Sequence, residues 1–200
     1  MNHLAHIYLS GDNDYIKIGN FIGDYIKGKK YTHYAPPIQK GIIMHRNIDD
    51  FTDKSPVPKK VKPLFSSFFH KYAGIVIDLF YDHFLAVNWY KFSEQPLEDF
   101  IKDFYVILER NNELLPDQVQ SFLPRMIEQN RLYSYKNIQG LEQALKIMSR
   151  RTSLPDYTSK AIKILSDNYL TINRNFLEFF PNIISFIDSK YSLDIQRKII

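Results

Sequence analysis

The chain has 200 residues, no cysteine and a formal net charge of +4 at pH 7. This length is enough to bury a hydrophobic core, so we expect a single domain over residues 1–200. The lack of cysteine excludes disulfide bonds, thiolate zinc sites and a cysteine nucleophile, which leaves nitrogen and oxygen atoms as the metal ligands.

Charge and hydropathy also bear on the partners of the chain. A small excess of positive charge suits an acidic protein or a phosphate-bearing substrate, although solvated lysines explain it equally well. No apolar run is long enough to span a bilayer, and the start of the sequence lacks the basic and apolar regions of a secretion signal. We therefore expect a cytoplasmic protein that binds neither membranes nor nucleic acid.

The periodicity of the apolar residues favours an all-α fold. Apolar side chains recur every three to four positions, there are only seven glycines, and no Asn-Gly or Asp-Gly hairpin turn occurs. Pro36 and Pro37 can open a helix, whereas Pro56 and Pro58 indicate a loop. In chain order the pattern predicts helices over residues 36–53, 61–69, 73–89, 97–108, 119–127, 141–148 and 157–180.

The same pattern indicates which side chains fill the core. The helix over residues 73–89 is strongly apolar and supplies much of the buried surface through Ile75, Leu79, Phe80, Phe84 and Leu85. The last helix, which we expect Pro181 to stop, has an aromatic stripe that forms either a ligand groove or core, and rings at helical spacing favour core. The polar tail over residues 189–200 is expected to fray.

All six histidines lie within the first 83 residues, among several aspartates. Histidine titrates near neutral pH and is the commonest metal ligand, so this crowding predicts a functional site. His3 and His6 are three residues apart and share a face if the first turn is helical. His3 is equally well explained as a structural histidine, and His6 is the better ligand candidate.

His45 and Asp49 are four residues apart on the predicted helix over residues 36–53, so their side chains can converge on one ion or one water. Arg46 and Asp50 form a second pair with the same spacing. A surface ion pair is the simplest interpretation of that second pair, and we favour it for Asp50. Arg46 is equally suited to clamp a phosphate oxygen beside a metal.

Asp78, Asp82 and His83 lie on the strongly apolar helix over residues 73–89. A buried carboxylate is costly unless it is hydrogen-bonded, paired with a cation or bound to a metal, and two carboxylates beside a histidine favour a ligand role. Asp24 follows two glycines in Gly19-Asn20-Phe21-Ile22-Gly23-Asp24, which allow close backbone approach. That segment lacks the spacing of a phosphate-binding loop.

Five short motifs occur in one order along most of the chain. Together they resemble the signatures of the acyl carrier protein phosphodiesterase family, and their shared order makes the resemblance specific. The motifs are Asn2-x-Leu4-Ala5-His6, Gly19-Asn20-Phe21-x-Gly23-Asp24, Gly41-x-x-x-His45-Arg46-x-Ile48-Asp49-x-x-Thr52-Asp53, Asp78-x-x-Tyr81-Asp82-His83-Phe84-Leu85 and Met148-Ser149-Arg150-Arg151.

The resemblance implies an all-helical fold related to the HD-domain metal phosphohydrolases. It also implies a manganese- or magnesium-dependent hydrolysis that removes phosphopantetheine from holo acyl carrier protein. Fold kinship alone does not determine the substrate. Combined with the residue chemistry, the resemblance predicts that one or two divalent ions are held by His6, Asp24, His45, Asp49, Asp78 and Asp82.

In the expected mechanism, a metal-activated water attacks the phosphorus while the seryl oxygen of the carrier protein leaves. His83 or His3 protonates that oxygen. Arg46 is a further catalytic candidate beside the metal. Arg150 and Arg151 either bind phosphate or cap the end of a helix.

Acyl carrier proteins are strongly acidic, so we expect a basic rim around the site, although lysines there are also typical of a solvated face. The candidate lysines are Lys27, Lys29, Lys30, Lys54, Lys59, Lys60 and Lys62. Two other functions fit part of the pattern. The metal ligands alone allow a nucleotide phosphohydrolase of the HD type, and the basic and aromatic surface allows a non-enzymatic helical module that binds a carrier protein or RNA.

Overall fold

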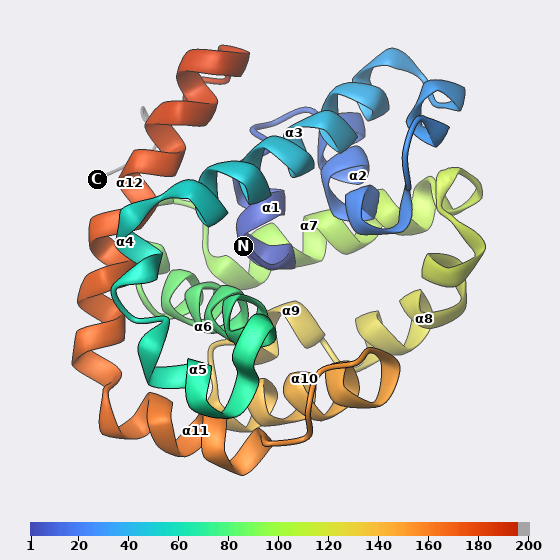
Figure 1. Cartoon of the computed structure of the whole chain (residues 1–200). Coiled ribbons are helices and arrows are strands. Elements are labelled where there is room, and N and C mark those ends of the chain that lie inside the picture. The colour runs from blue at the N-terminus through green and yellow to red at the C-terminus, as the bar shows by residue number, and fades with distance from the viewer. Residues whose placement is uncertain (196–200) are drawn as a thin grey trace.

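The computed structural model describes residues 1–195, and within this range it contains helices and no β-strand (Figure 1). The predicted all-α class is confirmed, while the relation to the HD-domain fold stays a prediction. The α-helices are α1 (His3–Tyr8), α2 (Asp14–Ile22), α3 (Pro36–Lys54), α4 (Pro56–Lys59), α5 (Pro63–Phe69), α6 (Ala73–Val87), α7 (Leu97–Arg110), α8 (Asp117–Glu128), α9 (Arg131–Ser134), α10 (Ile138–Arg151), α11 (Thr158–Asp167) and α12 (Tyr169–Tyr191).

Helix α3 begins at Pro36, as the proline pair predicts, because the first turn of a helix needs no N–H donor. It packs against α2 with the two backbones in contact at Gly19 and Gly41. A Cβ on Gly19 would lie 2.2 Å from the carbonyl oxygen of Ile38, so only glycine permits this approach. The contact determines how closely the side chains of α3 can approach the turn that follows α2.

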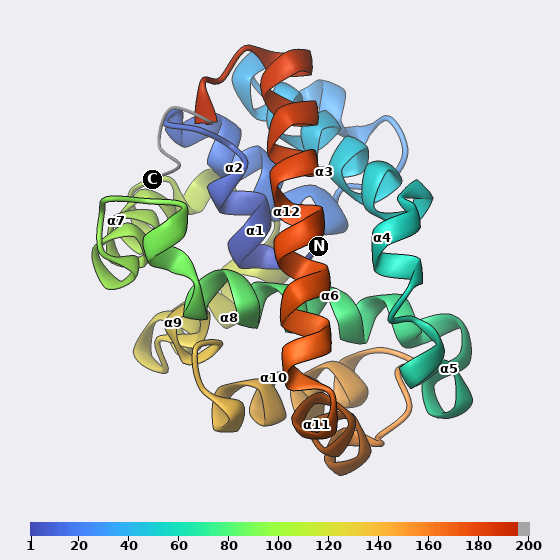
Figure 2. The same ribbon diagram turned by 90° about the vertical axis from the view of Figure 1, so that its left-hand side faces the viewer.

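Helix α6 lies in the middle of the fold and contacts α1, α5, α10 and α12 (Figure 1). Four of its predicted core residues are fully buried, namely Leu79, Phe80, Phe84 and Leu85. The fifth prediction was wrong, since Ile75 is 39% exposed in the first turn of α6, where it borders a cleft. Figure 2 shows α12 crossing α6, and the rings of Phe84 and Phe176 stack there with centroids 6.3 Å apart.

The last part of the chain differs from the predicted single helix. It forms α11 and α12, which meet at Asn168, where the side-chain amide donates to the carbonyl of Ile164 (2.9 Å). This competition for a backbone acceptor is typical of asparagine at helix ends. Pro181 does not stop α12, because burial of Phe180 and Ile184 near it, at about 1.5–3 kcal/mol each, outweighs the cost of about 3 kcal/mol for proline.

The predicted loop at Pro56 and Pro58 is wrong, because these residues form the short helix α4, in which Ser55 accepts the N–H of Val57 (3.3 Å). The predicted aromatic stripe is core at Phe176 and Phe180, which are buried, whereas Tyr157 at its start is exposed. Of the tail expected to fray, residues 189–191 belong to α12 and residues 196–200 lie outside the described range. Among the described helices, none combines the length and apolar character needed to cross a bilayer.

Candidate metal centre

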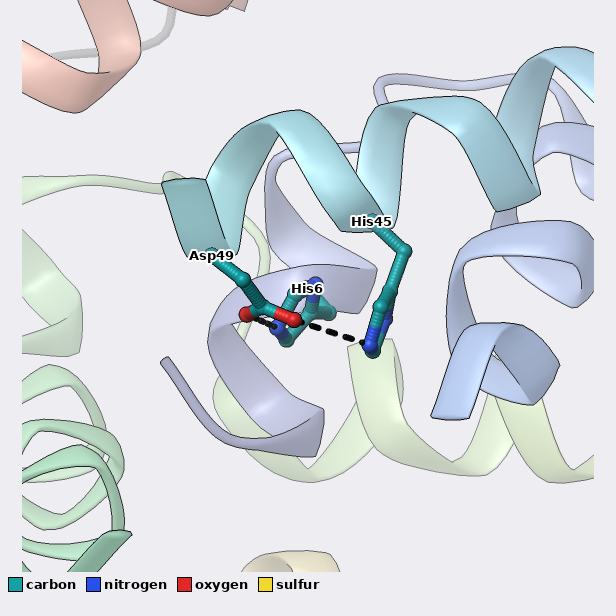
Figure 3. Close-up of side chains that lie close together, drawn as sticks. All are labelled: His6, His45 and Asp49. Carbon is teal, nitrogen blue, oxygen red and sulfur yellow. Dashed lines mark ion pairs between the residues drawn. The ribbon is translucent and has the colours of Figure 1, made fainter. Parts of the chain in front are cut away.

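Three side chains from α1 and α3 converge on one point (Figure 3). The Asp49 carboxylate lies between the two histidines, with Oδ1 3.2 Å from Nε2 of His6 and Oδ2 3.2 Å from Nε2 of His45. His45 and Asp49 share a face of α3 because they are one helical turn apart. One ligand atom from each of the three residues lies within 4.8 Å of the others, which is compatible with a divalent metal.

Both histidines are held by Asn20 of α2. Nδ1 of His45 donates to the backbone carbonyl of Asn20 (2.8 Å), and Nδ1 of His6 donates to its side-chain oxygen (2.7 Å). The amide nitrogen of Asn20 donates to the carbonyl of His6 and the hydroxyl of Ser10, so its side-chain oxygen is the acceptor. With both Nδ1 atoms donating, each Nε2 faces Asp49, as in metal-binding histidines, and Nε2 of His6 also lies 3.1 Å from the backbone carbonyl oxygen of Met1.

The two imidazoles differ in their pKa. Burial and the neighbouring His45 lower the pKa of His6 to about 4, against the opposing effect of Asp49. Burial also lowers the pKa of His45, but Asp24 and Asp49 outweigh burial and raise it to about 9. In the absence of metal, the cluster therefore holds its proton on His45, between two carboxylates.

The pKa values of the two carboxylates respond to the same contacts. The close contact with His45 (3.2 Å) lowers the pKa of Asp24 to about 2, against the effect of burial. Burial raises the pKa of Asp49, but His45 and His6 outweigh burial and hold it well below its usual range. Both carboxylates are therefore ionised at neutral pH and available as ligands.

The donor set fits a divalent cation. Nε2 of His45 is buried and makes no hydrogen bond of good geometry, although Oδ1 of Asp24 and Oδ2 of Asp49 each lie 3.2 Å from it. Short distances without hydrogen-bond angles are expected of such a group, because atoms that aim at a common ion need not aim at one another. Imidazole nitrogens with carboxylate oxygens and no thiolate suit a hard or intermediate divalent metal.

Asp24 approaches this group from the short 3₁₀ turn Gly23–Tyr25, and its side chain is 64% exposed. The turn can lie against His45 only because Gly23 has no side chain. A Cβ on Gly23 would be 2.3 Å from Cγ of the His45 ring. Gly23 thus allows His45 to contact Asp24 and Asp49 together.

Asp78 extends the acidic group along α6. Its Oδ1 lies 3.0 Å from the α-amino nitrogen of Met1, and that nitrogen lies 3.9 Å from Oδ1 of Asp49. Burial raises the pKa of Asp78, while the amino group opposes this effect. Asp78 is therefore connected to the three-residue cluster through Met1 rather than directly.

The surroundings of Asp82 differ from those that the predicted ligand role requires. Its carboxylate is completely buried and accepts the backbone N–H groups of Leu4 (2.7 Å) and Ala5 (3.1 Å) at the start of α1. Burial raises the pKa of Asp82 to about 7, against the effect of these N–H groups. Asp82 thus caps α1 from another helix and positions the helix that carries His6.

His3 and His83, the two predicted proton donors, lie in different places. Both ring nitrogens of His83 have partners away from the cluster, with Nδ1 2.8 Å from the carbonyl oxygen of Tyr135 and Nε2 2.9 Å from the hydroxyl of Tyr169. His3 lines the cleft described below, together with Asp24. Burial lowers the pKa of His3, and the charge of Asp24 opposes this effect.

Arg46 points away from the cluster. Its guanidinium donates to the carbonyls of Ile26 (2.9 Å) and Gly28 (2.8 Å) and so holds the loop after Asp24. The expected ion pair between Arg46 and Asp50 is not formed, because Lys54 lies closer to Asp50 (2.7 Å) on the same exposed face of α3.

A cleft of about 840 Å³ opens beside the cluster. Asp24, Asp49 and Asp78 line one wall. The opposite wall comes from α8, α9 and α10, and its apolar lining residues are Phe122, Met126, Ala144, Ile147 and Met148. The sequence did not reveal this second wall, because an amphipathic helix has the same pattern whether its apolar side meets another helix or borders a cavity.

The predicted basic residues divide into two groups. Arg151 and Lys27 line the cleft, whereas Arg150, Lys29 and Lys30 are exposed outside its lining. Two other lysines have partners elsewhere: Lys60 pairs with Glu178 (2.6 Å), and Lys59 donates to the carbonyl of Lys54 (3.2 Å). Lys62 also lines the cleft, together with Lys71, which the sequence analysis did not identify.

Comparison with known proteins identifies sequences that are similar to this chain over most of its length. A family model described as acyl carrier protein phosphodiesterase matches residues 1–183. The chain is 29% identical over 191 residues to an acyl carrier protein phosphodiesterase of Photorhabdus laumondii, covering 95% of this chain and 96% of the relative. It is 28% identical over 186 residues to the protein of that name in Yersinia enterocolitica, covering 92% of this chain and 96% of the relative. No solved structure matches.

Proposed function

Since this chain belongs to the acyl carrier protein phosphodiesterase family and is a hydrolase of phosphodiester bonds, we propose that it converts holo acyl carrier protein to the apo form. The proposed reaction is hydrolysis of the bond that joins phosphopantetheine to a serine of the carrier protein. The observation that carries the proposal is the convergence of His6, His45 and Asp49 beside a cleft. Family membership and this geometry are independent observations, and each supports hydrolysis of a phosphodiester bond.

We propose that His6, His45 and Asp49 hold a divalent ion, with Asp24 as a further carboxylate. Manganese or magnesium suits these donors. A bound ion supplies Lewis-acid chemistry, which activates water and neutralises charge on phosphoryl oxygens. Asn20 accepts a hydrogen bond from Nδ1 of both imidazoles, so that each Nε2 faces Asp49, and Asp82 fixes the helix on which His6 lies.

We assign the proton donor for the seryl oxygen to His3 rather than to His83. His3 lines the cleft, whereas both ring nitrogens of His83 already have partners. A donor is needed because the seryl alkoxide is a strong base and leaves poorly without a proton. Asp24 favours the charged form of His3 against the effect of burial.

The cleft has the size and lining that the prosthetic group requires. Its volume of about 840 Å³ falls within the usual range for small-molecule sites, roughly 300–1,000 Å³. The pantetheine arm is a long chain with amide groups, so it suits a wall that is mainly apolar with a few polar residues. Gln118 and Gln143 supply such polar groups among the apolar side chains of α8 and α10.

We propose that an acidic carrier protein docks on the lysines at the edge of this cleft. Lys27, Lys62 and Lys71 line the opening, and Lys29 and Lys30 continue the positive charge beside it. Lys59 and Lys60 fit this role less well, because each has a partner within the chain. Complementary charge mainly accelerates encounter and selects the partner.

The test is mass spectrometry of holo carrier protein incubated with the enzyme and manganese. We expect loss of the phosphopantetheine mass in that reaction, and no loss with a chelator, with His45→Ala or with Asp49→Ala. Asp50→Asn is the matched control, since Asp50 is exposed on the same helix and pairs with Lys54 rather than with the cluster. An unchanged carrier protein, together with hydrolysis of compounds in a nucleotide panel, would replace the proposal with the nucleotide phosphohydrolase.

A further inference from the structure

Two arginines lie in the wall of the cleft that faces the metal cluster. Arg131 begins α9 and Arg151 ends α10, and both line the cleft. Within the described part of the chain, neither guanidinium has a carboxylate at ion-pair distance. This contrasts with Lys54 and Lys60, which pair with Asp50 and Glu178. Together with Lys27, Lys62 and Lys71, the two arginines therefore give the cleft positive charge that no carboxylate at ion-pair distance neutralises within the described residues.

The local structure holds Arg131 in the wall. Asn130, the residue before it, has the left-handed φ of 42°, and its buried side-chain oxygen has no hydrogen-bond partner. Asparagine adopts the left-handed region more readily than most residues, so Asn130 can turn the chain between α8 and α9 at the point where Arg131 enters the wall. Nε of Arg131 donates to the side-chain oxygen of Gln129 (3.1 Å), which orients the guanidinium.

Arg151 is also held in place. Its guanidinium lies 5.9 Å from the centroid of the Phe122 ring, an apolar lining residue of the same wall. Burial lowers the pKa of Arg131, and the charges of Arg151 and Arg125 lower it further, so the arginines are close enough to repel one another. Arginine keeps its charge in proteins, so an anion bound between the two guanidinium groups would relieve this repulsion.

The arginines lie within electrostatic range of the acidic wall. The pKa of Tyr25 responds to both walls of the cleft, since burial and Asp24 raise it while Arg151 lowers it. Tyr135, which also lines the cleft, responds to both walls as well, since burial and Asp82 raise its pKa while Arg131 lowers it. An anion inside the cleft would thus have the metal cluster on one side and the arginine pair on the other.

We infer that Arg131 and Arg151 together bind the phosphate group of the substrate across the cleft from the metal cluster. The inference rests on the proposed function for the identity of the phosphate carrier. Guanidinium groups match phosphate because each offers two parallel N–H donors to two oxygens. Arg131 therefore determines substrate binding, although no sequence motif identifies it.

The proposed reaction increases the negative charge on the phosphate group that the arginines bind. A bond forms between the water oxygen and phosphorus as the bond from phosphorus to the seryl oxygen breaks, and the seryl oxygen receives one proton. The second water proton is released largely to solvent, because the phosphomonoester product carries a charge of about −1.5 to −2 at pH 7. The arginine pair consequently binds phosphopantetheine more tightly than it binds the singly charged diester.

The test measures binding of free phosphopantetheine to the manganese-supplied enzyme by calorimetry. Arg131→Met retains the aliphatic stem but not the charge, and we expect it to weaken binding about 10- to 100-fold, the effect of losing charge-assisted hydrogen bonds. Arg151→Met should weaken binding similarly, and Arg131→Lys should restore part of it. Arg150→Met is the matched control, because Arg150 lies outside the cleft lining, and it should bind like the parent.

Unchanged phosphopantetheine affinity in Arg131→Met, in a variant that manganese still stabilises, would overturn the inference. So would a variant that loses affinity for apo carrier protein only, because the arginine would then bind an acidic side chain. Binding and hydrolysis are separate measurements. If the parent enzyme does not hydrolyse holo carrier protein, the proposed function fails, while loss of phosphopantetheine binding in Arg131→Met still supports the arginine pair.

Discussion

The imidazole of His6 stacks on that of His45, with ring centroids 4.1 Å apart and planes inclined by 20°. Two rings this close cannot both be positively charged at low cost. This agrees with a pKa of about 4 for His6 and about 9 for His45. The stack presents two Nε2 atoms to one carboxylate, Asp49. The geometry therefore suits one shared cation better than two separate ion pairs.

Manganese should stabilise the folded protein through this cluster. At a concentration of 100 times the dissociation constant, a bound ion adds about 2.7 kcal/mol, which corresponds to an increase in Tm of about 5–10 °C. His45→Phe retains a ring over His6 but removes the ligand nitrogen, and we expect it to lose this increase in a thermal unfolding assay. Asp50→Asn should keep it. Equal increases in Tm for His45→Phe and Asp50→Asn would show that the ion binds elsewhere.

Gly23→Ala should disturb the cluster without altering any ligand. The new Cβ would lie 2.3 Å from the His45 ring, so the ring or the turn must shift, at a cost of about 1–3 kcal/mol. We expect lower stability in urea unfolding and a smaller manganese effect. Gly74→Ala is the control, since its Cβ position has no packing neighbour within 4 Å among the described residues outside its own helical backbone, and it should be neutral or slightly stabilising. Identical behaviour of the two variants would contradict the role of Gly23.

Asp82→Ala should destabilise the protein by about 2 kcal/mol, because the N–H groups of Leu4 and Ala5 lose their acceptor at the start of α1. Asp82→Asn keeps one acceptor oxygen and should lose less. Urea unfolding with a chelator present separates this structural effect from metal binding. A variant with full stability in chelator but no manganese effect would instead identify Asp82 as a metal ligand.

His83 should make folding stability depend on pH. Burial lowers its pKa in the folded protein below the usual value of about 6.5, although the carbonyl of Tyr135 opposes this effect. The unfolded chain therefore takes up a proton first as the pH falls. The stability contributed by neutral His83 is complete above about pH 6.5 and is lost as the pH falls through the folded pKa.

Urea unfolding from pH 7.5 to pH 4.5 tests this dependence against His83→Gln. We expect the variant to be less stable at pH 7.5 and to lose less stability on acidification than the parent does. Its rate of phosphodiester hydrolysis should be close to that of the parent, because His83 does not line the cleft. A large loss of rate with unchanged stability would restore His83 as the proton donor.

Charge reversal of Lys27, Lys29 and Lys30 together should lower kcat/KM for holo carrier protein at least tenfold at low ionic strength and flatten its salt dependence. Stabilisation by manganese should be unaffected, since these side chains lie outside the metal cluster. Lys59→Glu is the comparison, because that lysine is engaged within the chain. An unchanged kcat/KM after the triple reversal would exclude docking on this surface.

Several features of the fold could be predicted because they depend on local chemistry. The start of α3 follows from a proline pair, and the shared face of His45 and Asp49 follows from the helical repeat. The division of the last segment into α11 and α12 could not be predicted. It depends on whether Asn168 bonds to its own backbone, and on the packing that carries α12 past Pro181.

The sequence by itself determined the helical class, the kinds of donor atom available to a metal and the family to which the chain belongs. Only the tertiary structure decided which donors meet. Asp49 and Asp82 looked equivalent along the chain, yet one lies between two imidazoles and the other caps a helix 78 residues away. The physical reason is that a carboxylate binds whichever donor packing brings to it, and packing joins residues without regard to their separation in sequence.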